Sequence, residues 1–218
     1  MQIRRTFKVK TVQNMGSDEM IARAARVSTG KVLLEQDKIE GLIGYLVRER
    51  HTSPLESCVV TFRIEAPIFV AREWMRHRTQ SYNELSLRYT ESDCEFYVPP
   101  ADRPLVNDGI SAHPELVDGS TRQMHIVTSE ATFLYRMVEE SYRHMLEMGI
   151  AQEVARNVLP VSTYTAFYAT ANLNNWLKFL DLRNGDKGHP QWEIVQCAQM
   201  VQARLTELYP ITMGAWRG

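Results

Sequence analysis

Arginine and histidine are concentrated in one short stretch of the chain, which reads RHRTQSYNELSLR at residues 76–88. Arg76, His77, Arg78 and Arg88 supply strong hydrogen-bond donors, and small polar residues lie between them. Arginine is suited to bidentate capture of phosphate or of an ionised planar ring, because its fork of donors is rigid and its charge does not titrate away. The stretch therefore indicates an anionic ligand, with a solvated edge strand carrying surface arginines as the alternative.

The elements that must position these donors are a helix and a strand. Residues 67–78 are expected to form a helix opened by Pro67 in its first turn. Consecutive helical residues point about 100° apart, so residues 76–78 would contact different parts of a large ligand, or two ligands. Residues 84–90 alternate between polar and apolar side chains, which predicts a half-buried strand with a polar face.

Length and charge limit the classes of protein. The chain has 218 residues and a formal net charge of −1, which fits one domain with a proper core. The basic cluster is local, so a general nucleic-acid or membrane surface is not expected. No apolar run approaches the length of a membrane span, and the first residues lack an apolar signal core. We expect a cytoplasmic protein.

Cysteine, histidine and glycine patterns argue against several chemistries. Cys58, Cys94 and Cys197 are odd in number, far apart and outside any CxxC spacing, so we expect reduced thiols that serve in packing. The histidines lack HxxxH and HExxH spacing, which gives little support to a metal site. The chain also lacks GxSxG, GxxxxGK[ST] and GxGxxG patterns, so a phosphate-bearing ligand would have to be held by side chains.

The remaining patterns predict mixed α and β elements. Strands are expected at residues 2–12, 58–64 and 164–171, helices at 17–27, 38–50, 120–148, 172–183 and 191–208, and a long loop excursion or lid at 92–120. Pro210 is expected to stop the last helix. Arg183 falls on the apolar stripe of the helix at 172–183, so its guanidinium should point to the interior side. Alternatively Arg183, like Arg156, bonds the last carbonyls of its own helix.

The residues Arg76, His77, Arg78, Ser81, Asn83, Ser86 and Arg88 fit the signature RHRxxSxNxxSxR, and the chain resembles the flavin-dependent thymidylate synthases, the ThyX family. HTSPLE at residues 51–56, RNVLP at 156–160, LDLR ending at Arg183 and QWEI at 191–194 occur in the family's order. This resemblance implies an α+β fold, residues 1–218 forming a single catalytic domain, with a central, mainly antiparallel sheet flanked by helices and with FAD bound without a Rossmann unit.

The resemblance also implies an activity and a site. The expected reaction is reductive methylation of dUMP to dTMP, with 5,10-methylenetetrahydrofolate as carbon donor and NADPH as reductant, in a homotetramer whose sites are shared between subunits. Positions that resemble dUMP-binding residues are Glu73, Arg76, Glu84, Leu85, Ser86, Leu87, Arg88, Arg156 and Arg183, and the last is the activating, catalytic arginine. Positions that resemble FAD-binding residues are His51, Ser53, Arg76, His77, Arg78, Glu84, Asn172, Asn174, Lys178 and His189.

The chemistry of the family agrees with this inventory. Hydride passes from reduced flavin to the nucleotide without an enzyme nucleophile, which fits the absence of a cysteine in a reactive context. Ser86 has no evident base beside it and is assigned to binding. The sequence departs from the family pattern at Glu73, where glutamine is common, and at Asn174 and Lys178. Lys178 could itself hold a phosphate.

Two other functions stay open at this point. The first is a nucleotide-binding protein that kept the arginines but lost FAD and catalysis through the changes at Asn174 and Lys178. The second is an RNA-binding module that uses arginines interleaved with Tyr82 and Tyr89, which the small cluster and near-zero net charge disfavour.

Overall fold

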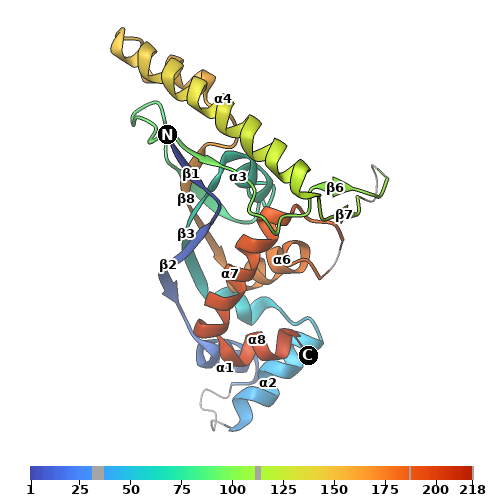
Figure 1. Ribbon diagram of the computed structural model, residues 1–218. Coiled ribbons are helices and arrows are strands. Elements are labelled where there is room, and N and C mark those ends of the chain that lie inside the picture. Colours follow the sequence, from blue (N-terminus) through green and yellow to red (C-terminus); the bar gives the residue numbers. More distant parts are fainter. Residues whose placement is uncertain (31–36, 111–113, 187, 218) are drawn as a thin grey trace. The chain divides into compact units, whose positions relative to one another are not determined.

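The computed structural model describes residues 1–30, 37–110, 114–186 and 188–217, and it has α+β architecture (Figure 1). The α-helices are α1 (Asp18–Arg26), α2 (Asp37–Arg48), α3 (Ile68–Trp74), α4 (Thr121–Glu147), α5 (Gln152–Ala155), α6 (Leu173–Arg183), α7 (Trp192–Leu208) and α8 (Pro210–Arg217). The strands are β1 (Gln2–Arg4), β2 (Lys8–Met15), β3 (Val59–Pro67), β4 (Ser81–Glu84), β5 (Glu95–Tyr97), β6 (Val106–Asn107), β7 (Leu116–Val117) and β8 (Tyr164–Asn172). Short 3-10 helices are η1 (Val27–Thr29), η2 (Ser53–Ser57) and η3 (Arg156–Val158).

The central sheet is antiparallel, and its four strands follow the order β2-β3-β8-β4. It confirms the predicted fold class. Two smaller pairs accompany it: β1 pairs with β5 in parallel, and β6 pairs with β7 in antiparallel fashion. Contacts group the described chain into two compact units. The first comprises residues 1–7, 65–76 and 84–167, and the second comprises residues 8–64, 77–83 and 168–218.

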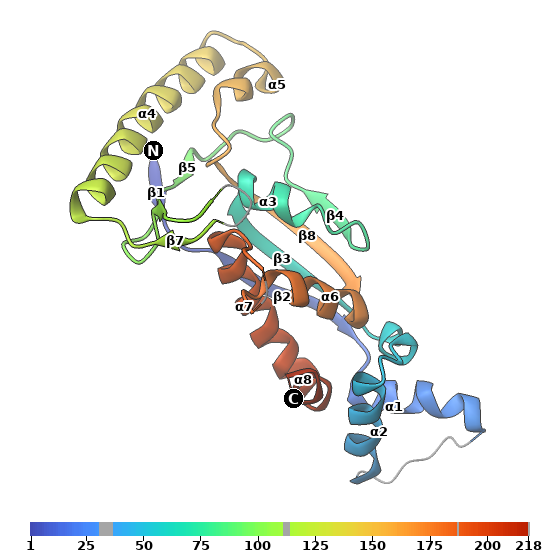
Figure 2. The same cartoon turned by 90° about the vertical axis from the view of Figure 1, so that its right-hand side faces the viewer.

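In the first unit the 27-residue helix α4 packs on α5 and on η3, and Figure 2 shows α4 and α5 in succession. Ser120 caps its first turn in a reciprocal capping box with Gln123. Tyr135 on α4 stacks on Phe96 of β5, with ring centroids 4.7 Å apart, and its hydroxyl donates to the Tyr97 carbonyl over 2.9 Å. Most other side chains of α4 are exposed or half-buried.

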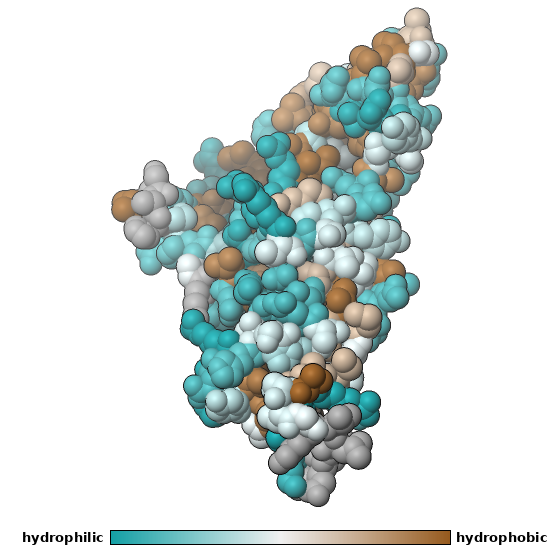
Figure 3. Space-filling view, turned by 180° about the vertical axis from the view of Figure 1, so that it is seen from behind, coloured by the Kyte–Doolittle hydropathy of each residue, from teal (hydrophilic) through white to brown (hydrophobic). Residues whose placement is uncertain are grey.

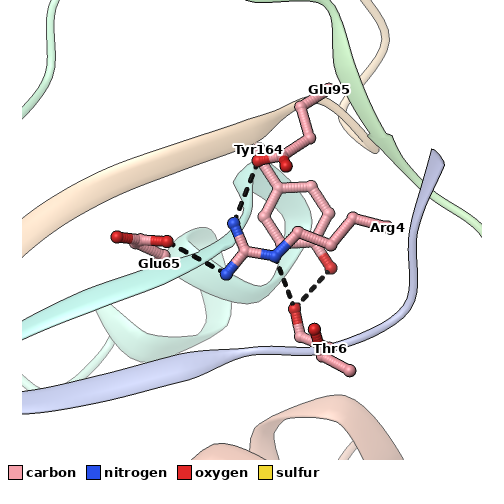
Figure 4. A network of polar contacts seen from close by, with 5 residues as sticks. All are labelled: Arg4, Thr6, Glu65, Glu95 and Tyr164. Atoms are coloured by element: carbon pink, nitrogen blue, oxygen red, sulfur yellow. Dashed lines mark hydrogen bonds and ion pairs between the residues drawn. The ribbon is translucent and has the colours of Figure 1, made fainter. Parts of the chain in front are cut away.

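A charged network anchors the N-terminal strand in the same unit (Figure 4). The Arg4 guanidinium donates to Glu95 over 2.9 Å and to Glu65 over 3.0 Å, and its Nε donates to the Thr6 carbonyl. It also lies 4.5 Å from the ring centroid of Tyr164. Burial disfavours the charge, but the bonds to Glu95 and Glu65 outweigh burial and raise the pKa of Arg4.

The second unit has a buried aromatic cluster around Trp176. Trp176 of α6 is fully buried, donates its indole N–H to the Val60 carbonyl over 3.1 Å and meets Phe62 edge to face at 4.9 Å. Helix α7 packs on β2 and on α6, and helices α1, α2 and α8 pack against one another (Figure 2). Ser17 accepts a hydrogen bond from the Met20 N–H and caps α1. Its neighbour Gly16 has a φ of +88°, and a Cβ there would lie 2.5 Å from the Cys58 sulfur.

Several predicted boundaries were wrong around the arginine-rich stretch. The helix predicted to end near Arg78 ends at Trp74, and residues 75–80 form turns in which the Gln80 N–H donates to the His77 carbonyl. The strand predicted at residues 84–90 is absent from the described chain there, because β4 ends at Glu84. The N–H groups of Tyr89 and Thr90 both donate to the Ser86 carbonyl, so a local turn satisfies the backbone instead of a sheet.

Two other differences lie at the chain ends. The single strand predicted at residues 2–12 is two strands, β1 and β2, separated by the bend at which Arg4 bonds to Thr6. Pro210 does not simply end the preceding helix but opens α8, which the sequence did not predict. Both carboxylate oxygens of Asp18, on α1, accept backbone N–H groups of Ile211 and Thr212. The cap of α8 therefore comes from far away in the sequence.

Neither a membrane-spanning helix nor a metal-binding cluster is found within the described ranges. None of the helices there is both long and apolar enough to cross a bilayer. In the same residues, no group of three or more His, Cys, Asp or Glu side chains is placed to hold a metal ion.

Candidate functional site

The RHR run lies just beyond α3, where the chain leaves the helix. Because residues 75–78 are in a turn, the side chains of Arg76, His77 and Arg78 are not held to helical spacing. Arg76 and Arg78 are exposed, and their guanidinium groups form no ion pair with any described residue. The turn therefore presents two cations that remain available to an anion.

His77 and Arg183 are in direct contact within the second unit. The Arg183 Nε donates to the His77 Nε2 over 3.0 Å, and both side chains are half-buried. Arginine can only donate, so Nε2 is the acceptor nitrogen and the imidazole in this arrangement is neutral, with its proton on Nδ1. Phe179, one turn before Arg183 on α6, meets the imidazole edge to face with centroids 4.9 Å apart. The last residue of α6 is thereby tied to the middle of the RHR run.

The first half of α6 carries two of the three positions at which the sequence departs from the family pattern, Asn174 and Lys178. Asn172 caps the helix, accepting the Asn175 N–H over 2.9 Å. Asn174 is only 4% exposed and donates from Nδ2 to the Glu56 carboxylate over 3.1 Å. Lys178 lies one turn further on and is exposed. Both Asn174 and Lys178 line a pocket of about 750 Å³ that is formed entirely by residues of the second unit.

The predicted histidine and serine positions near this pocket are exposed. His51 follows α2, and its ring meets Tyr45 edge to face at 5.7 Å. Ser53 opens η2, and Thr52 between them lines the pocket. His189 is exposed in the loop that precedes α7. The pocket therefore gathers Asn174 and Lys178 directly, and His51 and Ser53 flank one of its lining residues.

In the first unit the segment after β4 carries the predicted nucleotide-binding residues. Glu84 accepts a hydrogen bond from the Thr165 hydroxyl over 2.8 Å. The Leu85 N–H donates to the Ala166 carbonyl, which fixes the segment to the first part of β8. The Ser86 Oγ accepts the Arg88 N–H over 3.3 Å, so this hydroxyl helps to shape the turn. Leu87 is half-buried within that turn.

The other predicted residues of the first unit lie on separate elements. Arg88 is about half exposed and donates to Glu153 of α5 over 2.8 Å. Arg156 begins η3 and is half-buried, and no described residue accepts a hydrogen bond from its side chain. Glu73 is half-buried in the last turn of α3, and its carbonyl accepts the Arg76 N–H over 3.3 Å. The contacts inside this unit join Arg88 to Glu153, which the sequence did not single out.

The three thiols confirm the prediction of reduced packing residues. Cys58, Cys94 and Cys197 are free and fully buried. Burial raises the pKa of each thiol above its usual range. They are protonated and enclosed at neutral pH, so none is placed as a nucleophile.

Sequence reasoning missed the side chains that hold the predicted residues. Glu56, Glu153 and Thr165 are remote in sequence from the groups they bind, and no spacing rule connects them. Sequence reasoning also missed Arg50, which lines the pocket. Arg50 directly precedes His51, and its position beside a recognised motif was a usable signal for a binding residue.

Comparisons with known proteins show the family to which the chain belongs. A family profile described as "Thymidylate synthase complementing protein" matches residues 10–211. A flavin-dependent thymidylate synthase of Thermosipho africanus is 41% identical over 210 residues, which cover 95% of this chain and 90% of the relative. One of Streptomyces coelicolor is 40% identical over 228 residues, covering 99% and 93%.

The fold is shared with a solved structure. The UMP/dUMP methylase PolB from Streptomyces cacaoi, bound with 5-Br UMP, superposes with a TM-score of 0.92 at 40% identity, covering 100% of this chain and 96% of PolB. These relatives are 40% or 41% identical to the chain, and the matches cover 95% or more of it. The chain belongs to the family of flavin-dependent thymidylate synthases.

Proposed function

We propose that the protein converts dUMP to dTMP by reductive methylation, with 5,10-methylenetetrahydrofolate as carbon donor, NADPH as reductant and FAD as cofactor. The observation that carries the proposal is the half-buried Arg183, held by His77 at the end of α6 in a chain of this family. Residues 1–218 would act as one catalytic domain.

The chemistry must overcome the weak nucleophilicity of the uracil C5 carbon. Electron density at C5 rises either when a cysteine adds to C6 or when the ring takes on negative charge. The enclosed, protonated thiols of this chain do not favour the first route. A fixed guanidinium favours the second, because oriented charge in a water-poor site stabilises a developing anion. Arg183 would stabilise charge at N3 and the adjacent carbonyl.

Binding of the nucleotide would fall to the other arginines. Arg76, Arg88 and Arg156 offer guanidinium groups suited to bidentate contact with a phosphate. Glu84, Leu85, Ser86 and Leu87 would lie along the same ligand. The exposed ion pair between Arg88 and Glu153 is of a weak kind, so Arg88 can exchange Glu153 for phosphate.

The residues of the second unit fit a phosphorylated flavin cofactor. The pocket of about 750 Å³ supports this fit, because its volume is within the usual range for ligand sites and its lining includes Asn174 and Lys178. Asn172, His77, Arg78, His51, Ser53 and His189 would complete the FAD set, together with Arg76 and Glu84. When bound and reduced by NADPH, the flavin supplies the hydride that completes the methyl group.

A homotetramer with sites shared between subunits is part of the same proposal. It is supported by apolar side chains that α4 leaves exposed, namely Ile126, Phe133, Leu134 and Met137. Ile126, Phe133 and Met137 follow one another at helical spacing, and Figure 3 shows apolar side chains, in brown, along the arm that α4 forms. Such a stripe marks an interaction surface. Phe133→Asp should lower the mass measured by light scattering, and an unchanged mass would contradict this role of α4.

The second candidate substrate is UMP, because the structural relative PolB is a UMP/dUMP methylase. The experiment is an assay of the purified protein with methylenetetrahydrofolate, FAD and NADPH, in which dUMP and UMP are supplied separately. We expect dTMP from dUMP and little 5-methyl-UMP from UMP. Preferred methylation of UMP would reassign the substrate, and tight nucleotide binding with no methylated product and no flavin uptake would indicate a non-catalytic homologue.

A further inference from the structure

Tyr82 occupies a position that the signature RHRxxSxNxxSxR leaves open. It lies on β4, and its side chain is half-buried. The Tyr82 hydroxyl donates to the His77 carbonyl over 2.8 Å and lies 3.3 Å from the Oε1 atom of Gln80. A hydroxyl carries one proton, and only the shorter contact has an ordinary O–H···O length. The hydrogen bond from Tyr82 therefore goes to the backbone of His77.

The His77 carbonyl accepts a second hydrogen bond, which closes the turn after the RHR run. The Gln80 N–H donates to it over 3.2 Å, three residues further along the chain. Two donors at one carbonyl use both of its lone pairs and so restrict the plane of the peptide that joins His77 to Arg78. Tyr82 supplies the shorter of the two bonds and is itself held in a strand, so it contributes the larger share of this restraint.

Helix α6 contacts the same turn through three residues at intervals of four, which lie on one face of the helix. Asn175 donates from Nδ2 to the Thr79 carbonyl over 3.4 Å. Phe179 meets the His77 ring edge to face, and Arg183 donates to its Nε2 atom. All of these residues belong to the second unit. The side chain of His77 is thus held by α6, while its backbone is held by β4.

The direction of the His77 side chain depends on its backbone, because a rotation of the following peptide relative to the Cα atom changes where the imidazole points. The 3.0 Å bond from Arg183 to the imidazole tolerates little displacement, since a hydrogen bond weakens with distance and with a poorer angle. A displacement of about 1 Å at a catalytic group can cost on the order of 100-fold in rate. A contact to the His77 backbone therefore reaches the Arg183 guanidinium.

The Tyr82 hydroxyl keeps its proton over a wide pH range. Burial raises the pKa of this phenol above its ordinary value of 10.0. A phenolate would face the lone pairs of the His77 carbonyl and could not donate to it. The bond is therefore present throughout neutral and mildly alkaline solution.

We propose that Tyr82 is a positioning residue for the methylation reaction: its hydroxyl fixes the His77 carbonyl and, through the imidazole, sets the direction of the Arg183 guanidinium. The inference rests on the proposed function, because this direction matters for turnover only if Arg183 acts on the nucleotide. Tyr82 acts through His77 and is not itself a catalytic residue.

Tyr82→Phe removes one hydroxyl and keeps the ring. We expect kcat for dTMP formation to fall about tenfold, less than in Arg183→Ala, because the guanidinium remains but is held less closely. The KM for dUMP and the FAD content should stay within about twofold of the unaltered chain. An unchanged kcat, or a change confined to KM, would contradict the positioning role.

Tyr135→Phe is the matched control, because it removes a bond of the same kind elsewhere. The Tyr135 hydroxyl donates to the Tyr97 carbonyl over 2.9 Å within the first unit. Both variants should lower the melting temperature by about 2–4 °C. Only Tyr82→Phe should lower kcat. Equal losses of kcat in the two variants would show a general effect of stability and would overturn the inference.

A double-mutant cycle tests the route through the imidazole. In a His77→Leu background the imidazole is absent, so adding Tyr82→Phe should change kcat by less than about twofold. A further tenfold loss, about as large as in the unaltered background, would show that Tyr82 acts by a route that does not include His77.

Nitrogen-15 NMR of labelled histidine separates this inference from the proposed function. The His77 signal is identified by its loss in His77→Leu, and its Nε2 should appear as an unprotonated acceptor that becomes partly protonated in Tyr82→Phe. If this signal changes but the unaltered protein forms no methylated product, the positioning contact stands and the synthase is wrong. If dTMP is formed but neither the signal nor kcat changes in Tyr82→Phe, the synthase stands and the positioning role is wrong.

Discussion

Arg183 donates from Nε to the Nε2 atom of His77 over 3.0 Å, which ties the end of α6 to the middle of the RHR run. The contact uses the Nε atom, and the two terminal amino groups of a guanidinium form a fork whose geometry suits a planar anion. It also sets the tautomer of His77, because its acceptor nitrogen cannot carry a proton while this bond lasts. A neutral histidine in this position orients the Arg183 guanidinium without neutralising its charge, as the catalytic role proposed for Arg183 requires.

Replacement of Arg183 should separate catalysis from cofactor binding. Arg183→Ala should lower kcat by about 100-fold or more, equivalent to roughly 3 kcal/mol, because it removes the charge that stabilises the ionised ring. The FAD content, measured by absorbance of the purified protein, should stay near that of the unaltered chain. Near-normal dTMP formation by this variant would refute the catalytic assignment. His77→Gln, which can still accept from Arg183, should be milder than His77→Leu.

Glu153 should act as a competitor for the phosphate of the substrate. Glu153→Gln removes the carboxylate that engages Arg88 over 2.8 Å, so the KM for dUMP should fall severalfold. Stability should change by less than about 1 kcal/mol, because the pair is half exposed. Arg88→Gln should raise the KM instead. An unchanged KM in both variants would show that Arg88 does not contact the nucleotide.

The Arg4 network should be a stability determinant of the first unit. Arg4→Met would leave Glu65 and Glu95 facing each other with little solvent, since their side chains are 17% and 23% exposed. We expect a loss of roughly 3 kcal/mol in the free energy of unfolding, measured by denaturant titration. Adding Glu65→Gln and Glu95→Gln to Arg4→Met should restore part of the loss. Equal stability of the single and triple variants would contradict the charge argument.

The free energy of unfolding should fall above pH 9, because buried thiol and phenol groups have raised pKa values. Burial raises the pKa of the Cys197 thiol far above its ordinary value of 9.0. Above pH 9 the unfolded chain loses this proton while the folded chain keeps it, so the folded state loses up to about 1.4 kcal/mol per pH unit. Below pH 9 the contribution is constant. Cys58, Cys94, Tyr82 and Tyr209 have raised pKa values for the same first reason and act in the same direction.

The measurement is the melting temperature between pH 7 and pH 10.5. Cys197→Ala leaves a small cavity and should lower the melting temperature at every pH, but the decline above pH 9 should become shallower. A decline of equal steepness in the two proteins would show that this thiol does not contribute.

Local sequence patterns predicted the long helices. They failed where contacts between residues distant in sequence determine the structure. The helices at α1, α4 and α6 were predictable because Ser17, Ser120 and Asn172 are side-chain caps adjacent in sequence to the helices they cap. Helix α8 was not, because its cap is Asp18. The alternation at residues 84–90 predicted a strand, but the Ser86 carbonyl captures two later N–H groups and forms a turn.

The candidate site also has residues that the sequence identified and contacts that it could not predict. The RHR run, the motif at residues 51–56 and Arg183 could be singled out from residue types and order alone. The bonds from Asn174 to Glu56 and from Thr165 to Glu84 join residues 118 and 81 positions apart, which no local spacing encodes. Arg50 is a third case, because its place beside a recognised motif was a usable signal, whereas its left-handed φ of +55° is visible only in the structure.

The central claim is that this chain methylates dUMP with a hydride from reduced flavin and without an enzyme thiol. The most direct test reduces the FAD-loaded protein with NADPH in the absence of oxygen, and then adds dUMP and methylenetetrahydrofolate while flavin absorbance and dTMP are followed together. Reoxidation of the flavin that requires both additions, with an equimolar yield of dTMP, is the predicted result. Formation of dTMP while the flavin stays reduced, or reoxidation of the flavin without dTMP, would contradict the claim.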